Sequence, residues 1–225
     1  RDGQDLRRRL DRALAYDGVE NVSSAYGYYI DDFQWGPMAA LFAKDGNKQS
    51  PFAGYYIGRE RITAAATSFW GEPPVTRPGI SYHWRTQPVI SVSEDGRSAS
   101  FRVRLFQPRT HREPSREGEF YAAGFHSGMY PNDQAVLEDG VWRLWSLTID
   151  EPYFISPDWA TGWAAVPLVE GGEPPKPSRL MELYPPDIAM TALGRRAEHF
   201  RGGTGQTRQW PSILPMWFHY RNPVS

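Results

Sequence analysis

The chain has 225 residues, with 25 lysines and arginines, 26 aspartates and glutamates, and no cysteine. Its length suits one large domain or two small ones. The net charge of −1 argues against a dedicated nucleic-acid-binding protein, and the lack of cysteine excludes disulfides, thiolate metal sites and a cysteine nucleophile. No apolar run approaches the roughly 18–20 residues of a membrane span, so no membrane partner is expected. The compartment stays open, with the cytoplasm favoured and the periplasm as the alternative if a signal peptide has been removed.

Apolar residues at helical spacing dominate the beginning of the chain. Within residues 1–15, leucines and alanines recur every three or four positions between charged residues, and the same period continues through residues 17–33. Residues 35–43 predict a third, short helix, because Pro37 stands near its first turn, where proline is tolerated. The Asp-Gly-Asn sequence at 45–47 predicts the turn that ends this helix.

A strand pair, a helix and a loop are predicted next. Residues 51–54 and 55–58 are short β-prone segments bounded by glycines. Residues 59–70 consist of good helix formers, and the prolines of residues 71–79 predict a loop because they forbid regular structure.

The pattern then changes to that of strands. Residues 80–150 are β-rich, and the sequence Glu-Asp-Gly recurs at 94–96 and 138–140 as turn chemistry between strands. These features predict an antiparallel meander. Helices followed by a curled sheet place the chain in the α+β class, with one domain over residues 1–150.

The composition changes again after Asp150. Residues 151–225 are rich in proline and glycine, and only residues 187–200 have helical spacing. The segment nevertheless keeps many aromatic residues, whereas disordered tails are poor in them. We therefore predict an ordered arm that packs on the domain or on a neighbouring subunit, either as a lid over a pocket or as a purely structural element.

Two segments of the first half resemble a known family. YGYYIDDFQWGPMAALFAKDG at 26–46, followed by GYYIGRERI at 54–62, resembles the SnoaL-like branch of the NTF2-like superfamily. The resemblance covers about residues 15–150, and the segments HWRTQPVISV and DGVWRLWSL look like that family's long strands. It implies a cone in which helices close over a strongly curved antiparallel sheet and leave a pocket between them. The fold hosts many activities, so the resemblance is more specific for architecture than for function.

Within this family the chain looks most similar to scytalone dehydratase-type members, which implies three catalytic residues. Such members carry a carboxylate four residues before a tryptophan on the first long helix, here Asp31 before Trp35. They carry one histidine at the start of a long strand, here His83, and a second within a later strand, here His126. Imidazole moves protons near neutral pH, and a carboxylate in an aromatic pocket can act as a base or an orienting group. The alternative for Asp31 is a solvated helix end, for His83 an ordinary strand histidine, and for His126 a glycine-containing bulge. A further alternative is that the three residues together bind iron or zinc.

Aromatic and basic residues supply the predicted substrate contacts. Tyr28 lies on the helical face of Asp31, and a tyrosine hydroxyl is a good neutral hydrogen-bond donor near pH 7. Tyr56 and Trp35 extend this set, and Arg104 would bind an acidic or phenolic group if its strand turns it toward the pocket.

These residues predict a cofactor-independent lyase that acts on an aromatic small molecule and eliminates water or formaldehyde. The sequence contains no phosphate loop, no dinucleotide-binding glycine motif after a strand and no nucleophile elbow, so no nucleotide or flavin cofactor is expected, and no metal. We expect self-association as a homodimer or homotrimer. The alternatives are a non-catalytic binding module for an aromatic ligand or a protein, and an accessory subunit such as those of ring-hydroxylating dioxygenases.

Overall fold

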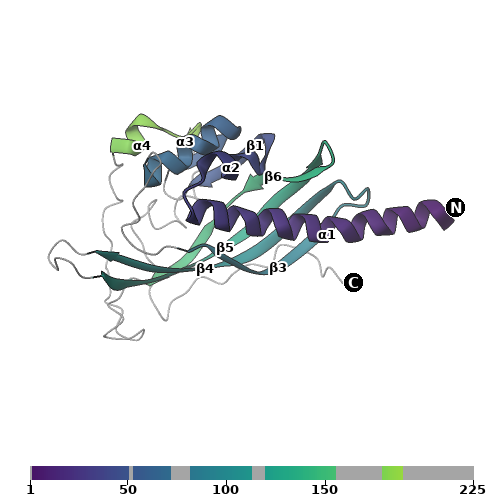
Figure 1. Cartoon of the computed structure of the whole chain (residues 1–225), viewed down its shortest axis with the longest axis horizontal. Helices are drawn as coiled ribbons and strands as arrows, with labels where there is room; N and C mark the ends of the chain where they lie inside the picture. Colours follow the sequence, from purple (N-terminus) through teal and green to yellow (C-terminus); the bar gives the residue numbers. More distant parts are fainter. Residues whose placement is uncertain (1, 51–52, 72–81, 113–119, 156–178, 190–225) are drawn as a thin grey trace.

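Helices from the first third of the chain lie along one side of a curved, open sheet (Figure 1). The structure is a computed structural model that describes residues 2–50, 53–71, 82–112, 120–155 and 179–189. Its helices are α1 (Asp2–Asp31), α2 (Trp35–Ala40), α3 (Arg59–Trp70) and the short α4 (Arg179–Leu183). The predicted α+β class is confirmed, and α3 has the predicted bounds.

The strand order within the described residues is β3-β4-β5-β6-β1-β2-β8, and β7 pairs with the first half of β5. The strands are β1 (Phe42–Ser50), β2 (Gly54–Ile57), β3 (Trp84–Val92), β4 (Ser98–Arg112), β5 (Phe120–Glu138), β6 (Val141–Leu147), β7 (Asp150–Ile155) and β8 (Ile188–Ala189). The predicted turns connect β3 to β4 and β5 to β6. All of these pairs are antiparallel except β1 with β6, which is parallel. This order leaves β3 at one end of the sheet.

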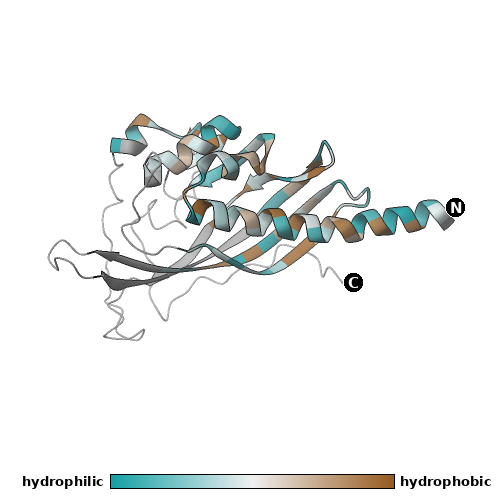
Figure 2. Cartoon of the chain, in the orientation of Figure 1, coloured by the Kyte–Doolittle hydropathy of each residue, from teal (hydrophilic) through white to brown (hydrophobic). Residues whose placement is uncertain are grey.

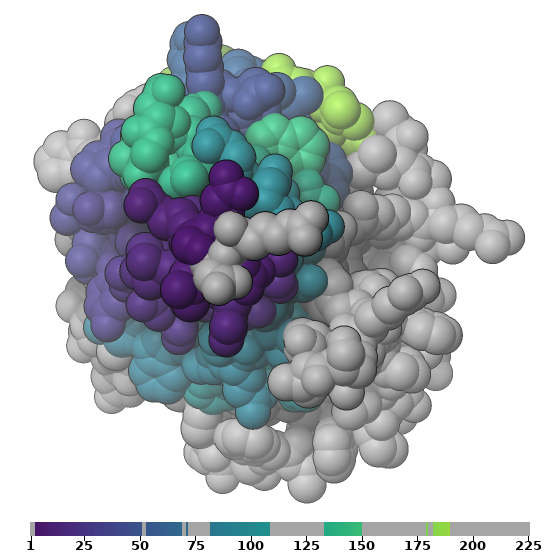
Figure 3. All heavy atoms as spheres, turned by 90° about the vertical axis from the view of Figure 1, so that its right-hand side faces the viewer, coloured from purple at the N-terminus to yellow at the C-terminus, as the bar shows by residue number. Residues whose placement is uncertain are grey.

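The two helical segments predicted at 1–15 and 17–33 form the single helix α1. One of its faces packs on the sheet and is buried over the second half of the helix, at Ala15, Val19, Val22, Tyr26 and Ile30. The N-terminal half projects past the sheet (Figure 1) and mixes hydrophobic with hydrophilic residues (Figure 2). Seen along the helix from its N-terminus, these first turns stand in front of the hairpin ends of the sheet (Figure 3). The helix ends at Asp31, two residues before Phe33 adopts a positive φ of 55°.

The predicted turn at 45–47 is wrong, because these residues lie inside β1. The helix predicted to 43 ends at Ala40, and the chain enters the sheet at Phe42, whose side chain is buried. The pairing of β1 with β6 is irregular between Phe42 and Asn47, so the Asp-Gly-Asn sequence forms a strand irregularity rather than a chain reversal. A Cβ at Gly46 would lie 2.9 Å from the carbonyl oxygen of Leu144, so glycine allows the two strands to approach there.

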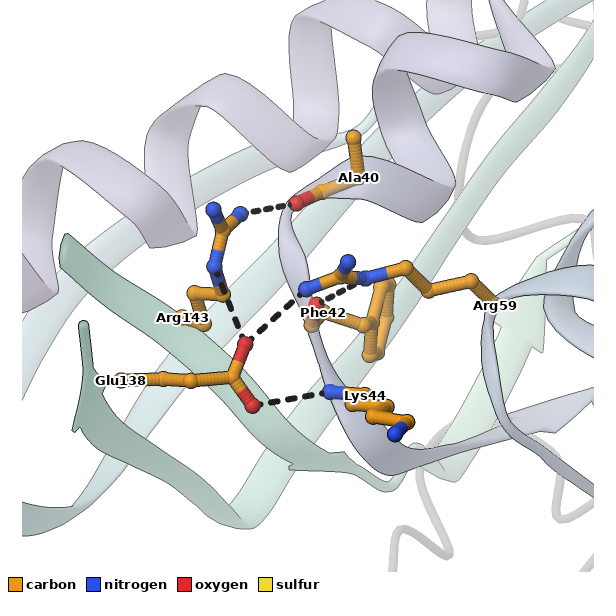
Figure 4. A network of polar contacts seen from close by, with 6 residues as sticks. All are labelled: Ala40, Phe42, Lys44, Arg59, Glu138 and Arg143. Carbon is orange, nitrogen blue, oxygen red and sulfur yellow. Dashed lines mark hydrogen bonds and ion pairs between the residues drawn. The ribbon is translucent and has the colours of Figure 1, made fainter.

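The carboxylate of Glu138 joins β5 to β1, α3 and β6 (Figure 4). Glu138, at the end of β5, accepts hydrogen bonds from the backbone N–H of Lys44 and from Arg59 Nη2, both at 3.0 Å. Arg143 Nε on β6 lies 3.3 Å from the same carboxylate. The two guanidinium groups also donate to carbonyl oxygens at the end of α2 and the start of β1, Arg143 to Ala40 and Arg59 to Phe42. Glu138 therefore fixes β1 and α3 to the β5–β6 hairpin.

Replacing Glu138 by glutamine is expected to lower the free energy of unfolding by about 1–2 kcal/mol, because the charge-assisted bonds to two arginines weaken. Urea unfolding of Glu138→Gln measures this loss. Glu94→Gln is the matched control, since Glu94 is exposed and contacts only the exposed Arg8 in the structure. Equal stability of the Glu138 variant and the wild type would show that the junction contributes nothing.

The described parts of the C-terminal segment pack on the domain. β7 extends the sheet beyond Asp150, and β8 pairs with β2. Tyr56 Oη donates a 2.8 Å hydrogen bond to the carbonyl oxygen of Tyr184, and Asp187 accepts bonds from the Ile57 N–H at 2.8 Å and Arg61 Nε at 3.1 Å. The segment therefore completes the β2 edge of the sheet.

The helix predicted over 187–200 begins instead with β8, because Asp187 and the following residues pair with β2. The rest of that prediction, and the tryptophans of the predicted arm at 159, 163, 210 and 217, lie outside the described residues. Within the described ranges, no helix is both long and apolar enough to cross a membrane.

Candidate active site

Asp31 and His83 form a hydrogen-bonded pair between the end of α1 and the start of β3. Asp31 Oδ1 lies 2.6 Å from His83 Nδ1. The backbone N–H of His83 also donates to both carboxylate oxygens, at 2.9 and 3.1 Å. The two side chains are only 10% and 12% exposed. The carboxylate therefore holds both the backbone and the ring of the histidine, so two of the three predicted catalytic residues are in contact.

These contacts define which ring nitrogen of His83 can act as a base. A carboxylate accepts hydrogen bonds, so the Nδ1 that faces Asp31 carries the proton. Nε2 is then the unprotonated nitrogen, and it accepts a 3.1 Å hydrogen bond from the side-chain amide nitrogen of Gln107. Asp31 and Gln107 together hold the imidazole in one orientation and one tautomer, with Nε2 as the basic atom.

Gln107 was not among the residues selected from the sequence. It lies on β4, and its side chain is buried. The signal was present in the alternation of β4, where Phe101, Val103 and Leu105 are the buried apolar positions and residue 107 continues the same face. A glutamine at the next inward position is a buried polar group that needs a partner.

The backbone brings His126 close to this pair in the sheet. In the register of β4 with β5, His126 stands directly opposite Gln107, and on its other side it pairs with Phe154 of β7. The side chain of His126 lies outside the described residues, so its catalytic role stays a prediction.

A buried ion pair supports the strand that carries His83. Arg85, two residues further along, contacts Asp133 of β5 at 2.6 Å and Ser23 of α1 at 3.0 Å, and its guanidinium lies over the ring of Tyr26 at 5.4 Å. Burial raises the pKa of Asp133 to about 6, and the positive charge of Arg85 opposes this rise. The pair ties β3 to α1 and β5, so it positions His83.

The approach of α1 to β3 depends on Gly27. A Cβ at this position would lie 2.7 Å from the carbonyl oxygen of His83. Gly27→Ala is therefore expected to push β3 from the helix and to lower both the melting temperature and turnover. Gly3→Ala is the control on the same helix, because its Cβ would meet nothing within 4 Å. Alanine normally stabilises a helix interior by about 0.5–1 kcal/mol, so a stabilised, fully active Gly27→Ala would contradict this packing.

The pair opens onto a pocket of about 570 Å³ between α1 and the beginning of β3. Small-molecule sites commonly have volumes of about 300–1,000 Å³. Its lining includes Tyr28, Asp31 and Asp32 from α1 and Tyr82, His83 and Trp84 from the neighbouring strand segment. Both members of the Asp31–His83 pair are therefore part of the pocket lining. Among the described residues, no group of three or more acidic or histidine side chains is arranged to hold a metal ion.

The four predicted substrate-binding residues are dispersed in the structure. Tyr28 lines the pocket and is 75% exposed. Trp35 is buried and donates its indole N–H to the carbonyl oxygen of Gly71, whereas buried Tyr56 holds the C-terminal segment. Arg104 is exposed on β4. Its strand alternation places it on the face opposite Gln107, because the two positions differ by an odd number of residues.

Comparison with known families shows which family the chain belongs to. The sequence profile of the SnoaL-like domain matches residues 11–148, which is more than half of the chain. The chain belongs to the SnoaL-like domain family, within the NTF2-like superfamily, as the sequence resemblance implied. No curated protein is significantly similar to it in sequence.

Several solved structures are similar to the chain. LinA is 17% identical, with a TM-score of 0.54, and the match covers 72% of this chain and 99% of LinA. A protein from Novosphingobium aromaticivorans that is named for scytalone dehydratase is 20% identical, with a TM-score of 0.49 and coverage of 67% and 91%. An NTF2-like protein with a cystatin-like fold from the same organism is 15% identical, with a TM-score of 0.47 and coverage of 65% and 87%.

Proposed function

We propose that the protein is a cofactor-independent lyase that eliminates water or formaldehyde from an aromatic small molecule by acid–base catalysis. The observation that carries the proposal is the Asp31–His83 pair, held at 2.6 Å and placed at the wall of a pocket. Dehydratases and polyketide cyclases are among the members of the SnoaL-like family, which supports an enzymatic role. The pocket's aromatic lining supports an aromatic substrate.

The base step uses His83. In the loss of water, Nε2 takes a proton from carbon, the C–H electron pair forms the new double bond, and the adjacent C–O bond breaks. The departing hydroxide takes this proton back from the imidazolium and leaves as water, which returns His83 to its neutral form. Asp31 stabilises the imidazolium that forms, because its carboxylate accepts the Nδ1–H bond throughout. Positioned proton transfer of this kind contributes about 100–10,000-fold to rate.

The loss of formaldehyde uses the same groups. Nε2 then takes the proton of a hydroxymethyl group, the oxygen electron pair forms the C=O bond, and the C–C bond breaks. The electron pair that remains on the ring-conjugated carbon takes up a proton. We assign this second proton transfer to His126, because its backbone pairs with Gln107, whose amide contacts His83. His126→Ala is therefore expected to retain substrate binding and lose turnover.

Product analysis tests the proposal. Purified protein is incubated with an aryl β-hydroxy ketone and with a hydroxymethyl-bearing diaryl compound, and mass spectrometry detects loss of water from the first or of formaldehyde from the second. The expected result is one of these products with the wild type and far less with Asp31→Asn. Asp17→Asn, an exposed aspartate on the same helix, is the matched control. Binding of both compounds without either product would favour the non-catalytic binding module.

A further inference from the structure

An aromatic surface lies beside the catalytic pair and has no part in the proton transfer described above. The rings of Tyr82 and Trp84 are parallel, with an interplanar angle of 8° and centroids 6.4 Å apart. Phe106 of β4 packs against Trp84 at 5.7 Å. We call Tyr82, Trp84 and Phe106 the ring row. Trp84 is 51% exposed, which is unusual for so large an apolar side chain.

Two residues of the ring row, Tyr82 and Trp84, line the pocket because β3 is the end strand of the described sheet. In a strand, neighbouring residues point to opposite faces, so Trp84 and His83 would normally serve different surfaces. β3 has no strand on its outer side within the described sheet, and α1 passes there instead, close enough for Gly27 to approach the carbonyl oxygen of His83. The pocket between them is lined by both His83 and Trp84.

The pocket therefore presents both aromatic and polar side chains to a ligand. Tyr28 from α1 and Trp84 from β3 present exposed rings, and the Asp31–His83 pair presents the polar groups. Aromatic rings stack favourably on exposed tryptophan and tyrosine, beyond the general benefit of burying apolar area. A saturated ring of the same size gains only the apolar part.

We propose that Trp84, together with Tyr28 of the same pocket, forms a stacking subsite for the aromatic ring of the ligand, and that the ring row keeps the indole in place. The subsite selects flat, unsaturated rings over saturated rings of the same outline. It rests on the proposed function only in taking this ligand to be the substrate, since the preference is a property of binding and needs no turnover.

Calorimetric titration of the whole chain with a matched pair of probes tests the subsite. The probes are 2-naphthol and its fully saturated counterpart, decahydro-2-naphthol, which share the hydroxyl group and the fused-ring outline. We expect the wild type to bind 2-naphthol about 3–10-fold more tightly. Trp84→Ala should remove this preference, and Trp84→Phe should keep most of it.

Two further variants separate stacking from loss of fold. Tyr28→Ala changes a side chain that is 75% exposed, so it should weaken 2-naphthol binding without lowering the melting temperature. Trp145→Ala is the control, because Trp145 on β6 is exposed but lies outside the pocket. An equal preference in wild type and Trp84→Ala, or no binding of 2-naphthol to the wild type, would overturn the subsite.

The same titrations keep this inference separate from the proposed function. His83→Ala should keep the preference for 2-naphthol over its saturated counterpart, since the rings of Trp84 and Tyr28 are unchanged. If the naphthol preference depends on Trp84 but no elimination product is ever formed, the subsite stands and the lyase fails. If product forms and the preference is independent of Trp84, the lyase stands and the subsite fails.

Discussion

His83→Ala is expected to lower turnover by about 100–10,000-fold, because it removes Nε2, the proposed base. The loss should appear mainly in kcat, since the imidazole is needed for the chemical step rather than for holding the ring. The melting temperature should change little, because the backbone N–H of residue 83 keeps both of its bonds to Asp31. Steady-state kinetics and thermal unfolding of the purified variant measure the two quantities.

Asp31→Asn extends this test. An amide can no longer stabilise the imidazolium, so kcat should fall while the variant still binds substrate. Asp17→Asn, an exposed change on the same helix, should leave both values unaltered. Wild-type kcat in His83→Ala would show that the pair is only a structural contact between α1 and β3.

The second large effect concerns stability, and it comes from Lys48 on β1. In the sheet register Lys48 is opposite Tyr56 on one side and Leu147 on the other, and all three side chains are buried. Its Nζ has two neutral partners, Gln49 O and Ser50 Oγ, each at 3.3 Å. Among the described residues no carboxylate pairs with it. Burial therefore lowers the pKa of Lys48 from 10.5 to about 8.

Lys48→Met is expected to stabilise the protein at neutral pH. A tenfold change in proton binding corresponds to about 1.4 kcal/mol, so a pKa lowered from 10.5 to about 8 destabilises the folded state by about 3 kcal/mol below pH 8. The lost bonds to Gln49 and Ser50 offset part of this gain, which leaves about 1–3 kcal/mol. Urea unfolding near pH 7 measures this gain in the free energy of unfolding. Lys44→Met, an exposed change on the same strand, is the control.

The pH dependence of stability tests the sign of the effect of burying Lys48. Between about pH 8 and 10.5 the unfolded chain still holds the lysine proton that the folded chain has released. Wild-type stability should therefore rise with pH in this window relative to Lys48→Met, and the gap between the two should close. A Met variant that is less stable than the wild type at neutral pH would mean that the ammonium group has favourable contacts that outweigh its burial.

Sequence patterns predicted those parts of the fold in which one local signal dominates. The helical spacing of α1 and α3 and the Glu-Asp-Gly turns needed no tertiary information. β1 was missed because its Asp-Gly-Asn sequence has the local chemistry of a turn, whereas the close approach of Leu144 holds Gly46 in a strand. The parallel pairing of β1 with β6 joins residues about a hundred positions apart, which no local pattern can reveal.

The candidate site, like the fold, could be predicted only in part from the sequence. The family resemblance predicted Asp31 and His83 as catalytic residues, and in the structure their side chains are in contact. Gln107 could have been found from strand alternation, but its contact with His83 depends on the register of β4 with β3. Trp84 was not selected from the sequence; alternation turns it from His83, and both line one pocket at the end strand of the sheet. The homodimer or homotrimer and the roles of Tyr56, Trp35 and Arg104 in binding stay predictions.

The tautomer of His83 tests the central claim most directly. Nitrogen-15 NMR of histidine-labelled protein near neutral pH distinguishes a protonated ring nitrogen from a bare one, and His83→Ala identifies the signals. The geometry predicts a proton on Nδ1, directed at Asp31, and a bare Nε2 that accepts from Gln107. A neutral ring with its proton on Nε2 would contradict the account, because His83 would then offer no base to the pocket.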